Sequence, residues 1–356
     1  MTKNRWLLPE GVEEILPRQA WQIESFRRRV LDLYRSWGYE LVIPPMLEYR
    51  DSLLLGRDSE MEWQTFQLTD QLSGRTLAIR ADITPQVARI DAHSYPQEGP
   101  SRLCYAGTVL HARPRSQLAS REPLEVGAEL YGDGSLQSDI EVISLMLATL
   151  GAANVARSYL DLGHVGIYRA LLESAALDAD AEEALLDAFH RKARTEVAEI
   201  LSRGTQESAA AARLNALVDL HGDLSVLDEA ARLLAGAPAE VMGAIAHVRE
   251  IAAAITRLFP EVRLHIDLAE LRGYRYHTGL VFAAYINGVG HAVANGGRYD
   301  HIGEVFGRAR PATGFSANVQ DLLSHASCGS DSDRAPARYR LELHDGHWRI
   351  VDSNEQ

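Results

Sequence analysis

Apolar and polar positions follow a helical period near the start of the chain. Apolar side chains recur every three or four residues between positions 18 and 37, at Ile23, Phe26, Val30, Leu33, Tyr34 and Trp37. This spacing places them on one face and predicts an amphipathic helix that ends at Gly38. The run Tyr39–Ile43 then has strand character. Pro44 and Pro45 cannot donate ladder hydrogen bonds, so this strand either ends there or lies at the edge of a sheet.

Short strand-like runs follow this first helix. The runs Thr65–Leu68 and Thr76–Arg80 flank a polar turn, and the runs Leu103–Val109 and Leu124–Tyr131 flank a polar loop over residues 111–122. Polar, turn-forming residues between two strand-like runs are typical of antiparallel hairpins. We therefore expect two hairpins in the first third of the chain.

Residues 165–260 are rich in Ala, Leu, Glu and Arg and contain few strand-forming runs. This composition favours helices, because these residues lose little conformational freedom in them. We interpret the region as a helical insertion. The apolar spacing gives candidate helices over 165–176, 180–203, 207–218, 224–234 and 238–258, and a further one before the insertion over 137–150.

The strand pattern returns after the helical insertion. Apolar runs occur at Arg263–Asp267, Leu280–Ile286 and His291–Ala294, and the pair Gly296-Gly297 is interpreted as a turn. Strands that are grouped apart from the helices predict an α+β fold built on a mainly antiparallel sheet.

The expected domain organisation is one large domain over residues 1–324, which includes the helical insertion 165–260. From residue 325 the chain becomes rich in Ser, Asp, Arg and Pro, the composition of a linker. The stretch 325–356 is too short for a domain. Its weak alternation favours one hairpin around Asp345-Gly346.

Composition and charge narrow the class of protein. The 356 residues are 46% hydrophobic and 24% charged, as in an ordinary globular chain, and the net charge of −13 opposes nonspecific binding to nucleic-acid phosphates. Cys104 and Cys328 are far apart and form no metal-binding motif, so we expect reduced thiols and no metal. No signal-peptide pattern and no run of membrane-spanning length occurs. We expect a cytoplasmic protein that does not enter a membrane.

Two short segments place polar side chains where a sheet face would be buried. Arg80, Asp82 and Thr84 alternate in RADITP, and Glu125 and Glu129 lie four apart in LEVGAEL, so each set shares one face of a strand. Buried polar groups need partners or a ligand. These residues form either a solvated sheet face or a pocket for a small cationic or zwitterionic ligand.

A third segment, LRGYRYHTGLVF, adds groups that can bind an amino acid. Arg272 next to Gly273 can meet a carboxylate with two parallel hydrogen bonds, and Tyr276 and His277 add aromatic and hydrogen-bonding surface. The nucleotide motifs GxxxxGK[ST] and strand–GxGxxG–helix do not occur, so we expect no nucleotide cofactor.

Residues 7–323 resemble the histidyl-tRNA synthetase family of class II synthetases. The resemblance is carried by LLPEGVEEILP, GYELVIPPMLEY, RADITPQVARI, YAGTVLHARPRSQLASREPLEVGAELYG, RGYRYHTGLVF and ANGGRYDHIGEVFGRARPATGF, in the family's order and spacing. It implies a class II synthetase-like fold, in which an antiparallel sheet is flanked by helices.

The departures from the family fall where amino-acid activation takes place. Leu110 stands where the synthetases have an arginine, and Ala112 stands where they have a glutamate. Asp321 replaces the arginine of their third motif, and Asn318 replaces a glycine. Activation by ATP needs fixed cations against the developing negative charge. The stretch after Leu323 is too short for the anticodon-binding domain. The resemblance therefore implies a chain with no catalytic residues and no tRNA.

The amino-acid pocket of the family persists. The resemblance implies that Asp82 and Thr84 contact an α-amino group, that Glu129 accepts from an imidazole N–H and that Arg272 meets the carboxylate. Tyr276 matches a pocket tyrosine. Glu125 and His277 also belong to the expected histidine site, although the synthetases have glutamine and tyrosine there.

This profile resembles the regulatory subunits of short-form ATP phosphoribosyltransferase. That resemblance implies a complex with the short catalytic subunit, four of each, around a regulatory homodimer. It also implies relay of feedback inhibition by histidine in the first step of histidine biosynthesis. Three rivals are a working ligase, an enzyme that activates an amino acid without tRNA, and a tRNA-binding regulator. Leu110, Asp321 and the acidic charge argue against them. Whether histidine binds in the pocket or at a subunit interface stays open.

Overall fold

The structure, a computed structural model, describes residues 6–54, 59–114, 119–155, 158–324, 339–344 and 347–352. The chain divides into two compact units, Met1–Ala326 and Ser327–Gln356. Within the described part of the second unit, β13 (Tyr339–His344) and β14 (His347–Asp352) pair as an antiparallel hairpin. Cys328 lies outside the described residues.

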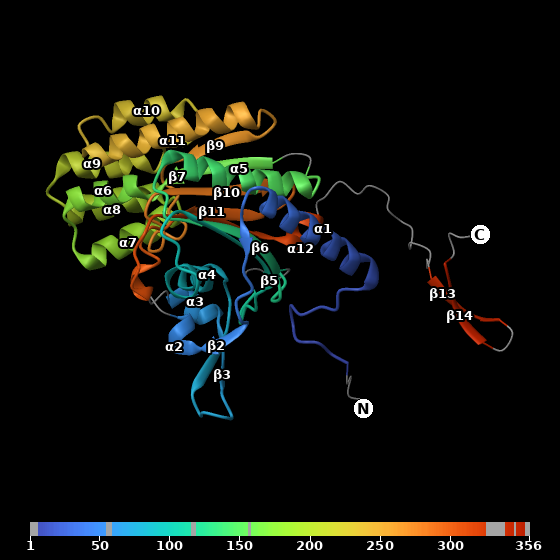
Figure 1. The fold of residues 1–356 in the computed structure, drawn as a ribbon. Coiled ribbons are helices and arrows are strands. Elements are labelled where there is room, and N and C mark those ends of the chain that lie inside the picture. Colours follow the sequence, from blue (N-terminus) through green and yellow to red (C-terminus); the bar gives the residue numbers. More distant parts are fainter. Residues whose placement is uncertain are drawn as a thin grey trace. The chain divides into compact units, whose positions relative to one another are not determined.

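A large sheet forms the centre of the first unit (Figure 1). Among the described residues it has nine strands, in the order β1 (Glu40–Leu41), β5 (Ser101–Thr108), β6 (Leu124–Tyr131), β12 (Ala312–Asn318), β11 (Ala294–Arg298), β10 (Leu280–Ile286), β7 (Ser158–His164), β9 (Arg263–Asp267) and β8 (His221–Gly222). The pairs from β5 to β7 are antiparallel, and only β1–β5 and β7–β9 are parallel in the described sheet. The predicted α+β fold with a mainly antiparallel sheet is confirmed.

The predicted turn at Gly296-Gly297 is wrong, because both glycines lie inside β11 in the middle of the sheet. A Cβ on Gly296 would collide with the carbonyl oxygen of Gly314, and one on Gly297 would collide with the ring of His277. Glycine is needed at these positions because neighbouring groups approach the strand backbone closely.

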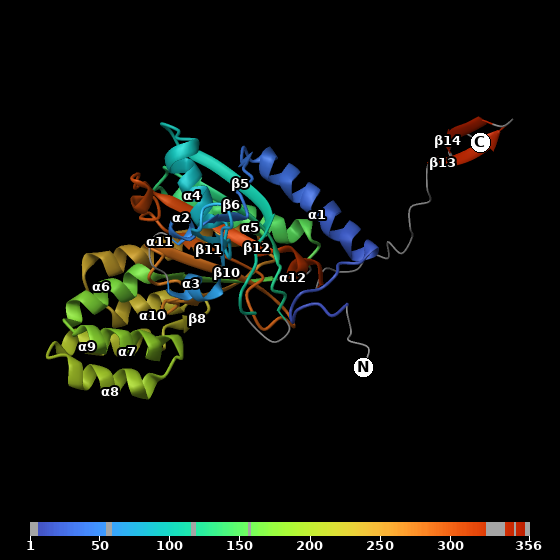
Figure 2. The same cartoon turned by 90° about the horizontal axis from the view of Figure 1, so that it is seen from below.

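Two long helices cover one face of the sheet. α1 (Pro17–Ser36) buries Ile23, Phe26, Val30 and Tyr34, the side chains whose spacing predicted it. It packs against α5 (Leu136–Ala152) and α12 (Val319–Ser324), and α1 and α5 both lie on β5, β6 or β12 (Figure 2). The apolar stripe of α1 therefore explains both its formation and its position.

Three strands between β1 and β5 in the chain form a second, smaller sheet. Its strand order is β2 (Leu47–Tyr49), β4 (Thr76–Ile79) and β3 (Phe66–Thr69). The accompanying short helices are α2 (Arg50–Leu53), α3 (Ser59–Gln64), α4 (Thr84–Arg89) and a π-helical turn at Ile90–Ser94. The predicted pairing of the strands near 65–68 and 76–80 is confirmed.

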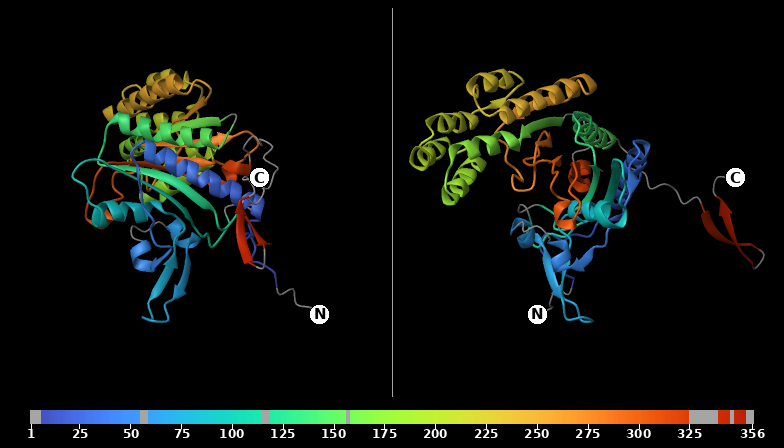
Figure 3. Two further views of the ribbon diagram at one scale, coloured as in Figure 1. Left: turned by 45° about the vertical axis from the view of Figure 1, so that its right-hand side comes forward. Right: turned by 60° about the vertical axis from the view of Figure 1, so that its left-hand side comes forward.

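The chain between β7 and β9 is mainly helical (Figure 3). We call residues 165–258 the helical region. Its helices are α6 (Val165–Ala175), α7 (Ala179–His190), α8 (Arg194–Gly204), α9 (Ser208–Leu217), α10 (Val226–Leu233) and α11 (Ala239–Leu258).

The single helix predicted over 180–203 is wrong, because the chain turns between α7 and α8. Lys192 has a left-handed φ of 51° there. Its ammonium group pairs with Asp267 of β9 at 2.7 Å, a long-range contact that helical spacing does not encode.

No helix in the described residues combines the length and the apolarity that crossing a bilayer requires.

Candidate functional site

A cavity of about 530 Å³ opens on the large sheet. Its floor comes from β6, β10, β11 and β12, and its walls come from the start of α4 and from the loop between β9 and β10. Six residues expected from the sequence line it, namely Asp82, Thr84, Glu129, Arg272, Tyr276 and His277. The fold thus brings together side chains from Asp82 to His277, which are 195 positions apart in the sequence.

Glu129, on β6, lies in the cavity floor. It has no exposed surface, and its β6 position pairs with Gly314 of β12. The hydroxyl of Tyr105 donates to one carboxylate oxygen at 3.4 Å, and the hydroxyl of Tyr299 donates to the other. A Cβ on Gly314 would collide with both Glu129 and Tyr299. Burial raises the pKa of Glu129 well above its usual range.

Asp82 and Thr84 lie where the chain enters α4. The backbone N–H of Thr84 donates to Oδ1 of Asp82 at 2.9 Å, and the Thr84 hydroxyl is 3.4 Å from that of Tyr105. Arg80, which alternates with them in sequence, does not line the cavity. Its guanidinium instead donates to the carbonyl oxygens of Thr108 and Pro44.

Glu125 does not line the cavity, contrary to the sequence-based expectation. It shares a strand face with Glu129, but the two lie four positions apart along the strand, a separation of roughly 13 Å. Its register partners are Gly107 and Asn318, and it is buried there. Its negative charge acts on Arg80. The alternation along β6 therefore places Glu125 and Glu129 on the same face of the strand, but it does not show how far the cavity reaches along that strand.

The loop over residues 270–278 supplies the remaining expected groups. Gly273 has a φ of 62°, which favours glycine. Nη2 of Arg272 donates to the hydroxyl of Tyr285 at 2.7 Å and to Oε2 of Glu270 at 3.3 Å. Nδ1 of His277 lies 3.3 Å from the carbonyl oxygen of Arg272. Burial lowers the pKa of His277 to about 4, so its imidazole is neutral at pH 7.

Tyr276 carries a buried hydroxyl that makes no hydrogen bond with any described residue. Its ring lies 5.0 Å from that of Tyr299 and 5.3 Å from that of His277. Buried polar atoms are rarely left without a partner. This hydroxyl in the cavity wall therefore fits a polar atom of a bound ligand.

Sequence reasoning missed further polar residues of the cavity, including Gln64, Asp161, Glu270, Asn295, Tyr299 and Ser316. Asp161 and Glu270 stand singly in or beside apolar strands, and only their place in the folded cavity marks them. With Asp82 and Glu129 they give the described lining four carboxyl groups and one guanidinium, that of Arg272. Such a lining attracts a ligand that carries positive charge together with one carboxylate.

The positions that depart from the synthetase residues for activation, Leu110, Ala112, Asn318 and Asp321, lie outside the cavity lining. Asp321 lies in the first turn of α12 and pairs with Nε2 of His291 at 3.1 Å, and its backbone N–H donates to Oδ1 of Asn318 at 3.2 Å. A carboxylate paired with an imidazole thus stands where the synthetases have a guanidinium. This position cannot stabilise a triphosphate.

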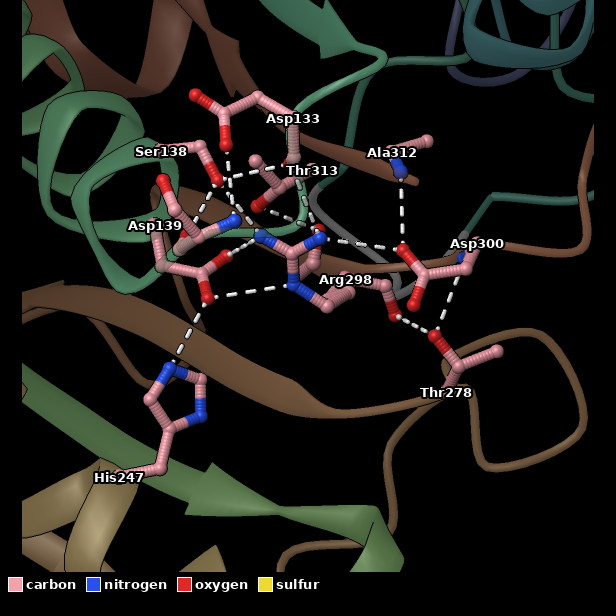
Figure 4. Close-up of polar contacts among 11 residues, drawn as sticks. Asp133, Ser138, Asp139, His247, Thr278, Arg298, Asp300, Ala312 and Thr313 are labelled. Carbon is pink, nitrogen blue, oxygen red and sulfur yellow. Dashed lines mark hydrogen bonds and ion pairs between the residues drawn. The ribbon is translucent and has the colours of Figure 1, made fainter. Parts of the chain in front are cut away.

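A buried ion-pair network fixes the sheet next to the cavity (Figure 4). Arg298 of β11 donates to Asp139 of α5 at 2.9 Å, and Nε2 of His247 lies 3.3 Å from the same carboxylate. Burial alone would raise the pKa of Asp139, but the hydrogen bond from His247 and the charge of Arg298 hold it below its usual range. The backbone N–H of Thr278 donates to the carbonyl oxygen of Arg298 at 2.7 Å, which joins the loop to this network.

Groups for metal or thiol chemistry do not accompany the cavity. In the described ranges, no cluster of three or more His, Cys, Asp and Glu side chains has an arrangement that could hold a metal ion. Cys104 is buried and free, and burial raises the pKa of its thiol to about 12. A thiol with so high a pKa is a poor nucleophile.

Comparisons with known proteins agree on one family. Residues 11–322 match the histidyl-tRNA synthetase family. The ATP phosphoribosyltransferase regulatory subunit of Thioalkalivibrio sulfidiphilus is 57% identical over 320 residues, which are 90% of this chain and 81% of that protein. The regulatory subunit of Stutzerimonas stutzeri is 55% identical over 93% of this chain and 83% of its own length.

Solved structures show the same fold. An ATP phosphoribosyltransferase regulatory subunit/histidyl-tRNA synthetase from Bacillus halodurans has a TM-score of 0.81 at 28% identity, over 92% of this chain and 85% of that one. A chain of the ATP phosphoribosyl transferase (HisG:HisZ) complex from Thermotoga maritima has a TM-score of 0.64 at 19% identity, over 83% of this chain and 96% of that one. The expected class II synthetase-like fold is confirmed.

Proposed function

Because the chain belongs to the histidyl-tRNA synthetase family and, within it, to the regulatory subunits of ATP phosphoribosyltransferase, we propose that it binds free histidine in the cavity and relays feedback inhibition to the catalytic subunit. The protein is a non-catalytic partner of that enzyme. Its catalytic partner joins ATP to a phosphoribosyl group, in the first step of histidine biosynthesis.

The observation that carries the proposal is the convergence of three kinds of group in one cavity. Glu129 offers a carboxylate to an imidazole N–H, Asp82 offers one to an α-ammonium group, and Arg272 offers a guanidinium to a carboxylate. Histidine carries all three partners. The cavity volume of about 530 Å³ is in the range of small-molecule sites.

Amino-acid activation is a poor alternative for this cavity. Activation needs cations against the phosphates of ATP, but Leu110 and Asp321 occupy the positions where the synthetases have arginine. Loss of one such donor typically costs about 3–4 kcal/mol in a transition state. The cavity therefore suits reversible binding of an amino acid.

The assembly is also part of the proposal. We expect self-association as a dimer and, with the catalytic subunit, an octamer of four subunits each, in the cytoplasm. Large apolar side chains on and after α1 support an interface there, since Trp21 and Ile43 are 66% and 82% exposed. Histidine relays inhibition if it favours one state of this assembly over another.

The test is formation of phosphoribosyl-ATP by the catalytic subunit of the same organism, with and without this chain and histidine. We expect the chain to raise the rate and histidine to lower it. Arg272→Ala and Glu129→Gln should each raise the half-inhibiting histidine concentration roughly tenfold or more, because the first removes the partner of the carboxylate and the second removes the carboxyl group that meets the imidazole. Arg275→Ala is the matched control, since Arg275 lies in the same loop but does not line the cavity.

Unchanged inhibition in both variants would exclude the cavity as the histidine site and favour a subunit interface. Failure of the wild-type chain to affect the rate, together with release of pyrophosphate from ATP or binding of tRNA, would restore the synthetase-like alternatives.

A further inference from the structure

Arg169, a side chain of the helical region, donates hydrogen bonds to the loop over residues 270–278. Nη2 of Arg169, on α6, donates to the carbonyl oxygens of His277 at 3.0 Å and Tyr274 at 3.3 Å, and Nη1 donates to that of Thr278 at 3.5 Å. In the described part of the chain, no backbone N–H donates to these three carbonyls. Their hydrogen bonding therefore depends on one guanidinium.

Other side chains of the helical region hold the same loop. The guanidinium of Arg169 also lies over the ring of Tyr274, 5.2 Å from its centroid, and Tyr168 packs edge-on against that ring at 5.2 Å. At the end of α7, Nε2 of His190 lies 3.2 Å from the carbonyl oxygen of Leu271. The helical region thus contacts both ends of the segment that carries Arg272, Tyr276 and His277.

The large sheet holds the C-terminal end of this loop through its backbone and contacts the Arg272 side chain through Tyr285 of β10. The backbone N–H of Thr278 bonds Arg298, whose guanidinium is fixed by the buried network with Asp139 and His247 (Figure 4). The backbone N–H of Val165 donates to the carbonyl oxygen of Gly279 at 3.0 Å, so α6 begins beside this anchor. Glu129 belongs to the sheet, whereas Arg272 belongs to the loop. The separation of these two groups therefore depends on what holds the loop.

We propose that Arg169 is a positioning residue of the histidine site, which sets the distance between the carboxylate-binding Arg272 and the imidazole-binding Glu129. This inference rests on the proposed function. A planar guanidinium suits the role because its N–H groups diverge in a fixed fork and reach several carbonyls at once. A lysine at this position offers one compact charge and would hold fewer of the three carbonyls.

The affinities for two ligands, histidine and histidinol, distinguish a positioning role of Arg169 from a general loss of stability. Histidine uses its carboxylate at Arg272, whereas histidinol has a hydroxymethyl group there and keeps the imidazole and ammonium groups for Glu129 and Asp82. Displacement of the loop should weaken histidine more than histidinol. A general loss of structure would weaken both ligands by the same factor.

The experiment is calorimetric titration of the full chain with histidine and with histidinol. We expect Arg169→Ala to weaken histidine binding roughly tenfold and histidinol binding less, and Arg169→Lys to give an intermediate affinity for histidine. The control is Arg203→Ala, because Arg203 lies on α8 with its side chain 80% exposed, paired only weakly with Glu199 at 3.7 Å. It should bind both ligands as the wild type does.

Wild-type affinity in Arg169→Ala would overturn the positioning role while the proposed function stands. An equal loss for both ligands would also overturn it, since Arg272 would then not be the group displaced. Absence of histidine binding to the wild-type chain would overturn the proposed function and this inference with it. Should Arg169→Ala fail to fold, Arg169→Gln and Arg169→Lys give the same comparison, because each retains an N–H donor.

Discussion

Glu129 shows at the level of one residue how the fold prepares a site. Its carboxyl group has no exposed surface, and neutral hydroxyl groups donate to it, among them those of Tyr105 and Tyr299. Neutral donors leave the negative charge only partly compensated, and burial raises its pKa. The neighbouring His277 is neutral at pH 7, because burial lowers its pKa to about 4, and so does not repel a cationic ligand. The imidazole N–H of a bound ligand would supply a further donor to the Glu129 carboxyl group.

His164 predicts a pH dependence of stability. Burial first, and the charge of His247 second, lower its pKa from 6.5 to about 4, although Asp139 opposes this. Arg169 and Arg298 also face it and act in the same direction as His247. In the unfolded chain the imidazole of His164 therefore takes up a proton near pH 6.5, whereas in the folded chain it takes up that proton only near pH 4. The free energy of unfolding should fall as the pH drops through this window.

The measurement is urea unfolding between pH 7 and pH 5. His164→Asn removes the titrating ring but keeps a side-chain acceptor for the backbone N–H of Gly166, which His164 caps at 3.2 Å. We expect a shallower loss of stability in this variant than in the wild type. His301→Asn is the control, because His301 is an exposed imidazole paired with Glu304. Equal pH slopes for His164→Asn and the wild type would contradict the prediction.

At the level of elements, sequence patterns succeed where the local period is uninterrupted. The helix predicted over 18–37 is α1, which buries one regular face, and the strand predicted over 124–131 is β6, which is buried almost throughout within the large sheet. The patterns fail where a distant residue decides the conformation. Gly296 reads as a turn residue, but the carbonyl oxygen of Gly314 fixes it inside β11.

The same limit applies to the candidate site. Glu129 and Arg272 were found because each is a charged residue in an unusual local context, a buried strand and an Arg-Gly step. Asp161, Glu270 and Arg169 carry no such signal. Their relevance comes from contacts across the sheet and from the helical region, and these contacts depend on the tertiary structure.

The end of α6 offers a prediction at the level of a helix. Ala176 caps α6 in a left-handed conformation, with φ 49° and ψ 47°. A Cβ is unfavourable there, so Ala176→Gly should raise the free energy of unfolding by about 0.5–1 kcal/mol, net of the greater entropy of the unfolded glycine. Ala170→Gly, inside the same helix, should lower it by a similar amount. Denaturant titration of both variants measures this, and a less stable Ala176→Gly would contradict the expected strain at the cap.

At the level of the whole molecule, the cavity is assembled from residues distributed between Met61 and Ser316. The helix α3 with the entry into α4, the large sheet, and the loop before β10 each contribute one part of its surface. A ligand that contacts all three parts can bind only when they are in their native arrangement. Binding and folding of the first unit are therefore linked.

This linkage predicts that histidine stabilises the chain in the absence of any catalytic subunit. At a free concentration one hundred times its dissociation constant, histidine should raise the free energy of unfolding by about 2.7 kcal/mol, and the thermal midpoint should increase with the logarithm of concentration. D-Histidine is the matched control, because inverting the α-carbon prevents simultaneous contact with Glu129, Asp82 and Arg272. Glu129→Gln should shift the midpoint less at the same histidine concentration. Equal stabilisation by both enantiomers would mean that histidine does not engage these three groups together, and the assignment of the cavity to histidine would then be wrong.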